Sequence, residues 1–142
     1  MTECALTAAN AADGPTGVGL LTEEQPGLEV LGDSAYGSGA TRAALRAAEH
    51  VQTIKPLPLS SAVADGFTIH DFQIDWQAGT VCCPAGYRTT ITASGQASFA
   101  RWCQRCPLRG RCTTARGGRT MQVHPHEEEL RAARRRATTR SF

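Results

Sequence analysis

Residues 27–48 read GLEVLGDSAYGSGATRAALRAA and decide how we interpret the fold. Leu28, Val30 and Leu31 form a short apolar run that ends at Asp33, and a turn rich in glycine and serine follows. The alanine-rich segment after the turn is typical of a helix. We therefore predict a buried strand, a turn and a helix that packs back on the sheet. This order puts the Asp33 carboxylate at the carboxyl end of the strand, where open α/β sheets bind ligands and metals.

An aspartate at such a position has two interpretations. Most aspartates that follow a strand accept a hydrogen bond from the next turn or helix and act only as caps. The alternative is a metal ligand or catalytic carboxylate, and the position alone favours the cap. Within the same turn, Ser38 or Thr41 is expected to cap the following helix.

Composition and charge limit the possible classes of protein. Hydrophobic residues make up 41% and charged residues 20% of the 142 residues, which is typical of a globular domain and not of a disordered chain. No apolar run is long enough to span a bilayer, and Glu3 stands where a secretory signal would be basic. We therefore expect a cytoplasmic protein that makes no membrane contact.

The charge is unevenly distributed along the chain. Through Ala100 there are ten acidic and four basic residues, whereas from Arg101 onward eleven arginines face three glutamates. A basic end on an acidic chain suggests contact with a polyanion, most commonly nucleic acid. A solvated helical tail would have the same composition, and charge alone does not separate the two.

Turn signals and apolar patterns divide the chain into three parts. Residues 1–59 read as alternating strands and helices, and residues 60–123 read as short strands joined by turns, which is typical of a small β-rich insertion. Residues 124–142 read as a helix with glutamates in its first turn and arginines in its last, as the helix dipole favours. The expected elements are strands near 2–10, 52–55 and 119–123 and helices at 16–24 and 125–137.

Four cysteines have a spacing that suits a structural zinc site. Cys103 and Cys106 form a C-x-x-C knuckle, and Cys83 and Cys112 complete a set of four thiols. Four thiolates satisfy Zn²⁺ in a closed tetrahedral site, and a small β-rich segment without a large core gains stability from the metal. Disulfides are the alternative, which a reducing compartment disfavours. The other two cysteines are expected to be free thiols.

Arginines interleave with the knuckle and predict a surface for the DNA backbone. Guanidinium groups form paired, charge-assisted hydrogen bonds with phosphate, and such contacts position a protein on DNA. Trp102 lies among them and either stacks on a base or packs, and we expect packing. The arginines assigned to this surface are Arg105, Arg109, Arg111, Arg116 and Arg119.

Three segments together resemble one known family. They are GDSAYGSGATR at residues 32–42, ECALTAANAADG at 3–14 and CQRCPLRGRCTTARGGRTMQVHPHEEEL at 103–130. In their order along the chain, these segments resemble DDE-type transposases of bacterial insertion sequences. The resemblance is to a subgroup with a cysteine-bearing insertion before the last catalytic helix. The resemblance covers about residues 2–136.

The resemblance implies a fold, a chemistry and a partner. It implies a partial ribonuclease-H-like α/β core with a small β-rich, cysteine-bearing insertion. The family uses three carboxylates to hold two Mg²⁺ ions that cut and rejoin DNA at transposon ends. Asp33 matches the second carboxylate, and Arg42 matches an arginine expected to contact the substrate backbone. The first aspartate is expected upstream of Met1 and the last glutamate beyond Arg136, and Glu127 to Glu129 do not match its motif.

We therefore expect the chain to be a fragment of a transposase that is inactive alone. An incomplete core exposes a sheet edge, which favours association into a homo-oligomer. The alternative, from another functional class, is a zinc-stabilised nucleic-acid-binding module without catalysis. A third possibility is an unfolded relic without function, against which the strand–turn–helix pattern argues mildly.

Overall fold

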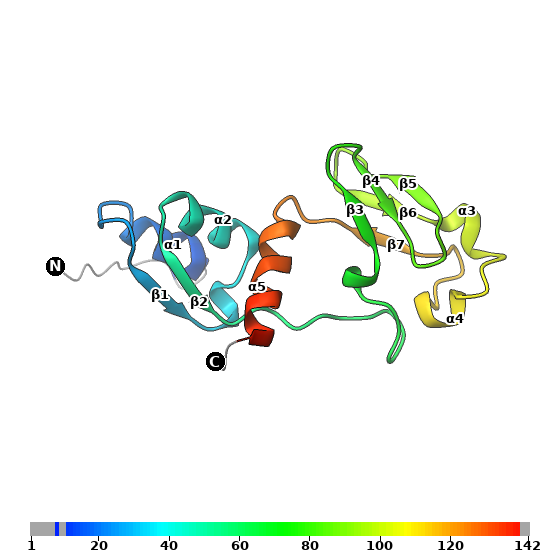
Figure 1. The fold of residues 1–142 in the computed structure, drawn as a ribbon, viewed down its shortest axis with the longest axis horizontal. Coiled ribbons are helices and arrows are strands. Elements are labelled where there is room, and N and C mark those ends of the chain that lie inside the picture. The colour runs from blue at the N-terminus through cyan, green and yellow to red at the C-terminus, as the bar shows by residue number, and fades with distance from the viewer. Residues whose placement is uncertain (1–7, 9–10, 140–142) are drawn as a thin grey trace. The chain divides into compact units, whose positions relative to one another are not determined.

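The computed structural model describes residues 8 and 11–139 and consists of two compact units (Figure 1). Residues 1–57 and 126–142 form the first unit, and residues 58–125 form the second. No helix among these described residues is long and apolar enough to cross a membrane. The strand expected near residues 2–10 lies outside the described residues, except for Ala8.

The first unit is a mixed α/β arrangement around a pair of parallel strands. Residue Glu29 of β1 pairs with Val51 of β2, and the register continues to Gly32 and Ile54. Helix α2 makes the crossover that parallel neighbours require. The unit contains α1 (Asp13–Leu20), β1 (Glu29–Gly32), the 3-10 helix η1 (Ser34–Tyr36), α2 (Gly39–Ala47), β2 (Val51–Ile54) and α5 (Glu127–Thr139).

The strand–turn–helix predicted from residues 27–48 is confirmed. Ser38 is the residue that caps α2, because its hydroxyl accepts a hydrogen bond from the Thr41 backbone N–H at 3.1 Å. Leu45 of α2 and Ile54 of β2 are each 2% exposed and belong to the apolar interior of the unit. Helix packing on one face of the strand pair therefore accounts for this part of the fold.

The prediction that this strand is buried is wrong for the described part of the chain. Alternate residues of a strand point to opposite faces of a sheet. Leu31 of β1 is 73% exposed and Val51 of β2 is 50% exposed, so the described residues leave one apolar face of this pair uncovered. A parallel pair is normally covered on both faces. Association of copies through this face stays a prediction.

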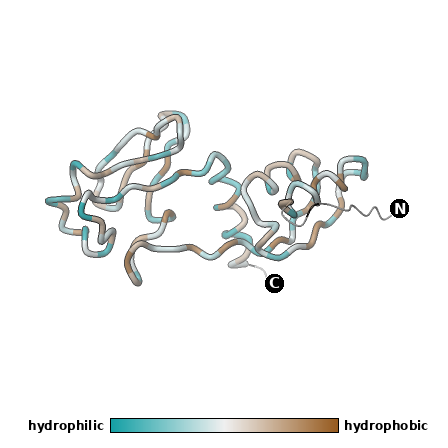
Figure 2. The backbone as a smooth tube through the Cα atoms, turned by 180° about the vertical axis from the view of Figure 1, so that it is seen from behind, coloured by the Kyte–Doolittle hydropathy of each residue, from teal (hydrophilic) through white to brown (hydrophobic). Residues whose placement is uncertain are grey.

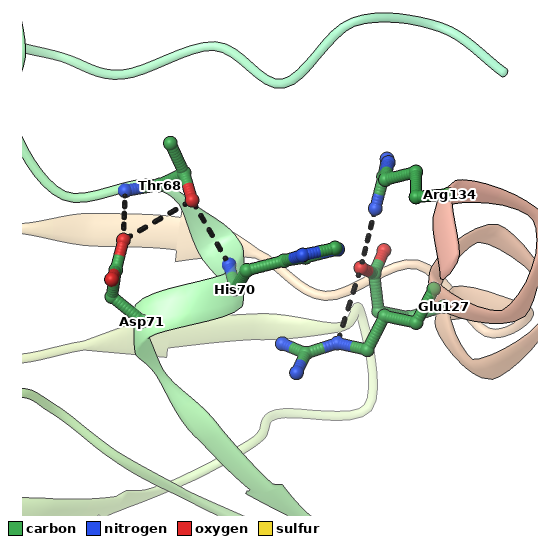
Figure 3. A network of polar contacts seen from close by, with 6 residues as sticks. Thr68, His70, Asp71, Glu127 and Arg134 are labelled. Carbon is green, nitrogen blue, oxygen red and sulfur yellow. Dashed lines mark hydrogen bonds and ion pairs between the residues drawn. The ribbon is translucent and has the colours of Figure 1, made fainter. Parts of the chain in front are cut away.

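Helix α5 belongs to the first unit, although it follows the second unit in the chain. It is hydrophilic along most of its length (Figure 2). Ala133 is nevertheless 2% exposed, and Glu127 is also 2% exposed. The Glu127 carboxylate forms ion pairs with Arg134 at 3.1 Å (Figure 3) and with Arg131 at 3.4 Å. Part of the basic charge at the end of the chain is therefore neutralised by ion pairs within the first unit.

The second unit is built from short antiparallel strands, as the sequence predicted. Strands β3, β4 and β5 form one sheet in that order, and β6 pairs with β7 in another. The unit contains η2 (Ile69–Asp71), β3 (Gln73–Asp75), β4 (Thr80–Cys82), β5 (Arg88–Thr90), β6 (Gln96–Ser98), α3 (Ala100–Cys103), α4 (Arg109–Cys112) and β7 (Thr120–Gln122).

A small core and tight local caps hold the second unit together. Phe72 and Val81 are fully buried, and Phe99 lies 5.7 Å from Phe72 between ring centroids. Before β3, the Thr68 backbone N–H donates to the Asp71 carboxylate at 2.8 Å, which forms a capping box around η2 (Figure 3). A small core buries little apolar surface and so stabilises the unit weakly, and local contacts such as this capping box add to its stability.

Candidate functional site

Asp33 lies where the sequence predicted it, directly after the carboxyl end of β1. Its side chain is exposed, and its Oδ1 accepts a hydrogen bond from the Ala35 backbone N–H at 2.8 Å, which makes Asp33 the N-cap of η1. The cap interpretation is therefore confirmed. A carboxylate has a second oxygen with its own acceptor sites, so the cap does not use all of its capacity to bind a cation.

Arg42 is buried and holds the backbone of the first unit together. It is 1% exposed, and its guanidinium donates to the carbonyl oxygens of Gly37 at 3.0 Å, Ile54 at 3.1 Å and Lys55 at 3.3 Å. The predicted contact with a DNA backbone is wrong, because these three carbonyls take the place of a phosphate. In the sequence, Arg42 lies four positions before Arg46, which puts the two on one helix face but does not indicate which of them is buried.

The charge environment of Arg42 follows from this burial. Burial lowers the pKa of the Arg42 guanidinium, Arg136 and Arg134 of α5 lower it further, and Glu129 opposes them. Arginine nevertheless stays protonated in proteins, so a full positive charge sits beneath the turn that follows Asp33. The hydrogen bond to Gly37 ties this turn directly to the guanidinium.

The four cysteines predicted as zinc ligands gather around one small pocket of the second unit. Cys83 follows β4, Cys103 ends α3, Cys106 lies in the next turn and Cys112 ends α4, and all four line the pocket. All four are free thiols, as is Cys82. The Arg119 backbone N–H donates to the Cys103 sulfur at 3.3 Å. The tertiary structure thus brings together residues up to 29 positions apart in the chain.

These thiols do not form a metal site as they are placed. In the described part of the chain, no group of three or more His, Cys, Asp or Glu side chains is arranged to hold a metal ion. Burial raises the pKa of the Cys112 thiol, Arg119 opposes this effect, and Cys103, Cys83 and Cys106 reinforce it. Without a metal, Cys112 is therefore an inert buried thiol at neutral pH.

The arginines around the knuckle divide into half-buried and exposed groups. Arg109 donates to Gln104 at 2.9 Å and to the carbonyls of Ala115 at 3.0 Å and Arg116 at 3.1 Å, so it holds the loop after α4. Arg119 donates to the Cys112 carbonyl at 3.3 Å. These hydrogen bonds give the two arginines a structural role, and their contact with DNA stays a prediction. Arg105, Arg111 and Arg116 are exposed.

The basic part of the chain begins well before Arg101, which the charge counts up to Ala100 and from Arg101 onward do not show. Between Asp75 and Glu127 the sequence contains no acidic residue and seven arginines. The stretch from β4 to β7 is therefore uniformly basic, and it also carries the four clustered cysteines. The spacing between successive acidic residues would have revealed this from the sequence.

Comparison with known protein families matches residues 82–142 to a family described as "Transposase DDE domain". Residues 82–142 are therefore similar to a transposase DDE domain. No curated protein and no solved structure matches the chain. The family match agrees with the resemblance found in the sequence and runs from β4 through the cysteine cluster into α5.

The matched transposase DDE segment and the Asp33 segment are different parts of the chain. The match begins at Cys82, after the strand–turn–helix that carries Asp33. It includes all four clustered cysteines and all the exposed arginines described above. The transposase DDE match therefore bears on the basic, cysteine-bearing part, whereas the role of Asp33 depends on the geometry at the end of β1.

Proposed function

We propose that this chain contributes to a DDE transposase, with Asp33 as one carboxylate of its catalytic site. The observation that carries the proposal is the position of Asp33 at the carboxyl end of β1, which pairs in parallel with β2, in a chain that also carries transposase DDE sequence. Residues 13–54 would then be part of a ribonuclease-H-like core. An exposed carboxylate at this edge of a sheet is suited to a ligand site.

Asp33 is the residue that would hold Mg²⁺. Magnesium prefers oxygen ligands and keeps several of its waters, so a single carboxylate can provide one contact but does not build a site. When bound, paired Mg²⁺ ions activate the attacking oxygen and stabilise the leaving oxygen in phosphoryl transfer. Asp33 forms no metal-holding group with other described residues, so further carboxylates are required for chemistry.

The DNA backbone would bind the exposed arginines of the second unit. Arg105, Arg111 and Arg116 are exposed and lie in the stretch without acidic residues. Arg111 also rests on the Phe67 ring, 4.6 Å from its centroid, which orders the side chain. A stretch of 51 residues with seven arginines and no acidic residue favours polyanion binding, and the transposase DDE match makes DNA the expected polyanion.

We expect the chain to bind duplex DNA from transposon ends, and to leave that DNA uncut in the presence of Mg²⁺ or Mn²⁺. Binding should weaken steeply as salt rises, because each neutralised phosphate releases counterions. Substituting glutamate for Arg105, Arg111 and Arg116 together should weaken binding at least about 100-fold at low salt. Fluorescence anisotropy measures the binding, and a gel assay measures the cutting.

Two outcomes would contradict this expectation. Salt-independent binding, or binding that survives the triple substitution, would remove the assigned surface. Cleavage that disappears in an Asp33→Asn variant would show that this chain is already a complete nuclease. Glutamate at Lys55, Arg135 and Arg136 together is the matched control for charge, because these three basic residues are exposed in the first unit and are not part of the surface.

We also propose that the four clustered thiols bind a structural Zn²⁺ ion. Their chemistry suits the ion, because four thiolates form the closed tetrahedral set that zinc prefers. Their gathering around one pocket and the N–H bond to Cys103 support the proposal, and side-chain adjustment would have to bring the sulfurs to coordinating distance. A zinc-stabilised nucleic-acid-binding module is accordingly the second candidate function, which the compact second unit favours.

Metal analysis of the purified chain tests the zinc proposal. Protein prepared with zinc and a reductant should contain about one Zn²⁺ per chain. Replacing Cys103 or Cys112 by serine should abolish the stoichiometric metal and lower the thermal midpoint of the second unit. Cys82→Ser is the matched control, because Cys82 neighbours Cys83 but does not line the pocket. Clearly substoichiometric zinc in the unsubstituted chain would overturn the proposal.

A further inference from the structure

A row of aromatic side chains runs from the core of the second unit to its surface. The Phe99 ring, which is 2% exposed, lies 6.2 Å from the Trp102 ring between centroids. Trp102 in turn stacks on Tyr87 at 5.6 Å with an interplanar angle of 13°. Tyr87 is 36% exposed and is the outermost member of the row. The row therefore joins a buried anchor to an aromatic ring at the surface.

The position of Tyr87 is held by the backbone around it. The Cys83 backbone N–H donates to the Tyr87 carbonyl at 2.8 Å, and the Gly86 N–H donates to the Cys83 carbonyl at 2.8 Å. Gly86 has a φ of +87°, which closes the turn before Tyr87. A ring held on both its backbone and one face loses little conformational freedom when a ligand stacks on it.

One positive charge lies against this row. The Arg101 guanidinium lies 5.0 Å from the centroid of the Trp102 ring, whereas Arg88, which follows Tyr87 in the chain, forms an ion pair with Asp75 at 3.8 Å. Both arginines are exposed, and both belong to the stretch between Asp75 and Glu127 that has no acidic residue. An exposed aromatic ring stacked on a tryptophan that carries the Arg101 guanidinium matches a ligand that has flat aromatic groups on an anionic backbone.

We propose that Tyr87 is a stacking platform for an unpaired DNA base. In duplex DNA both faces of each internal base are covered by its neighbours, so only an unpaired or terminal base offers a free face. Stacking on an aromatic side chain combined with backbone contacts to arginine is the general mode of single-strand binding. This inference rests on the proposed transposase function, since that function makes DNA the nucleic acid concerned, and it adds the strand state that the second unit recognises.

Binding of the full chain to oligothymidylate tests the platform. We expect fluorescence anisotropy to detect salt-dependent binding of a labelled single strand of about 15 nucleotides, which matches the site sizes of small single-strand binders. Tyr87→Ala should weaken this binding about ten-fold, because one base loses its stacking partner. Tyr87→Phe keeps the aromatic face and should retain the affinity. Tyr87→Leu keeps apolar bulk against Trp102 and should lose affinity as alanine does.

Two controls separate stacking from charge and from damage to the fold. A strand of abasic residues has the same backbone charge without bases, so it should bind the unsubstituted chain and Tyr87→Ala equally. Tyr36→Ala removes an equally exposed tyrosine from the first unit and should leave binding unchanged. Equal binding of oligothymidylate by the unsubstituted chain, Tyr87→Ala and Tyr87→Leu would overturn the platform, as would an equal loss on the abasic strand.

Failure of the platform can be distinguished from failure of the proposed function. The same variants are measured on the transposon-end duplex, and in this proposal Tyr87 contributes nothing to duplex binding. Duplex binding that depends on Arg105, Arg111 and Arg116, together with no effect of Tyr87→Ala on the single strand, would remove only the platform. Loss of binding to both kinds of DNA by the unsubstituted chain would remove both proposals.

Discussion

Replacing Arg42 with alanine should lower the free energy of unfolding of the first unit by about 3–5 kcal/mol. The substitution removes three hydrogen bonds to backbone carbonyls, those of Gly37, Ile54 and Lys55. The carbonyls would remain in a place that water reaches poorly, because the Arg42 side chain is 1% exposed. Leaving buried acceptors without donors costs more than the net value of the bonds themselves.

Hydrogen exchange at the amides of α2 and β2 measures this effect locally. Both tryptophans, Trp76 and Trp102, lie in the second unit, so their fluorescence does not report on the first. Exchange in α2 and β2 should accelerate by a factor of about 100 or more, as a loss of 3 kcal/mol implies. Arg42→Lys should lose most of the same stability, because an ammonium group does not reproduce the planar fork that reaches three carbonyls.

Arg46→Ala is the matched control for Arg42. Arg46 lies on the same helix and makes one ion pair, with Glu129 at 2.8 Å, from a side chain that is 73% exposed. Glu129 is buried, but the arginine of this pair lies in solvent, so we expect the pair to contribute only about 1 kcal/mol. Similar small effects for the two substitutions would show that the carbonyl contacts of Arg42 do not hold the unit together.

Gly118→Ala should destabilise the second unit by about 2–4 kcal/mol. Gly118 is buried and has a φ of +93°, a conformation that residues with a side chain rarely adopt. A Cβ at this position would lie 2.8 Å from the Cys103 Cβ and 2.9 Å from the Ala100 Cα. Neither atom is at the end of a flexible side chain, so the backbone near the cysteine pocket would have to shift.

Thermal unfolding followed by tryptophan fluorescence measures the change, because both tryptophans are in this unit. The buried Cys103 thiol, which is 6% exposed, should also react faster with a thiol reagent in the variant. Gly117→Ala is the matched control: no heavy atom lies within 4 Å of its Cβ position, so its effect should stay within about 0.5 kcal/mol. Equal midpoints for the two variants would contradict the close packing at Gly118.

Local pattern was enough to predict the elements that carry the candidate site. The apolar run before Asp33 and the alanine-rich segment after the turn correspond to β1 and α2, and the strand expected at 119–123 corresponds to β7 (Thr120–Gln122). Ser38 and Thr41 were both candidate caps of α2, and Ser38 is the residue that caps it. Strand and helix periods and cap chemistry involve neighbours within a few residues, which is why sequence reasoning reaches them.

The roles of the arginines could not be predicted in the same way. Arg42 and Arg46 are four residues apart on one helix, yet the first is buried against backbone carbonyls and the second is exposed. Arg109 and Arg116 both follow the C-x-x-C knuckle, yet Arg109 holds a loop whereas Arg116 is exposed. The partner of a long charged side chain depends on which distant backbone groups lie within its reach.

By itself, the sequence of this protein determined the local order of strand, turn and helix, the basic segment, the cysteine spacing and the resemblance to DDE transposases. Each of these depends on residue identity and on nearby positions. Tertiary structure alone decided that four cysteines share one pocket, that Tyr87 and Trp102 stack, and that the face of β1 carrying Leu31 is exposed among the described residues. Each of these features depends on residues that are far apart in the chain. The packing of whole helices and strands against one another determines which side chains meet and which stay exposed.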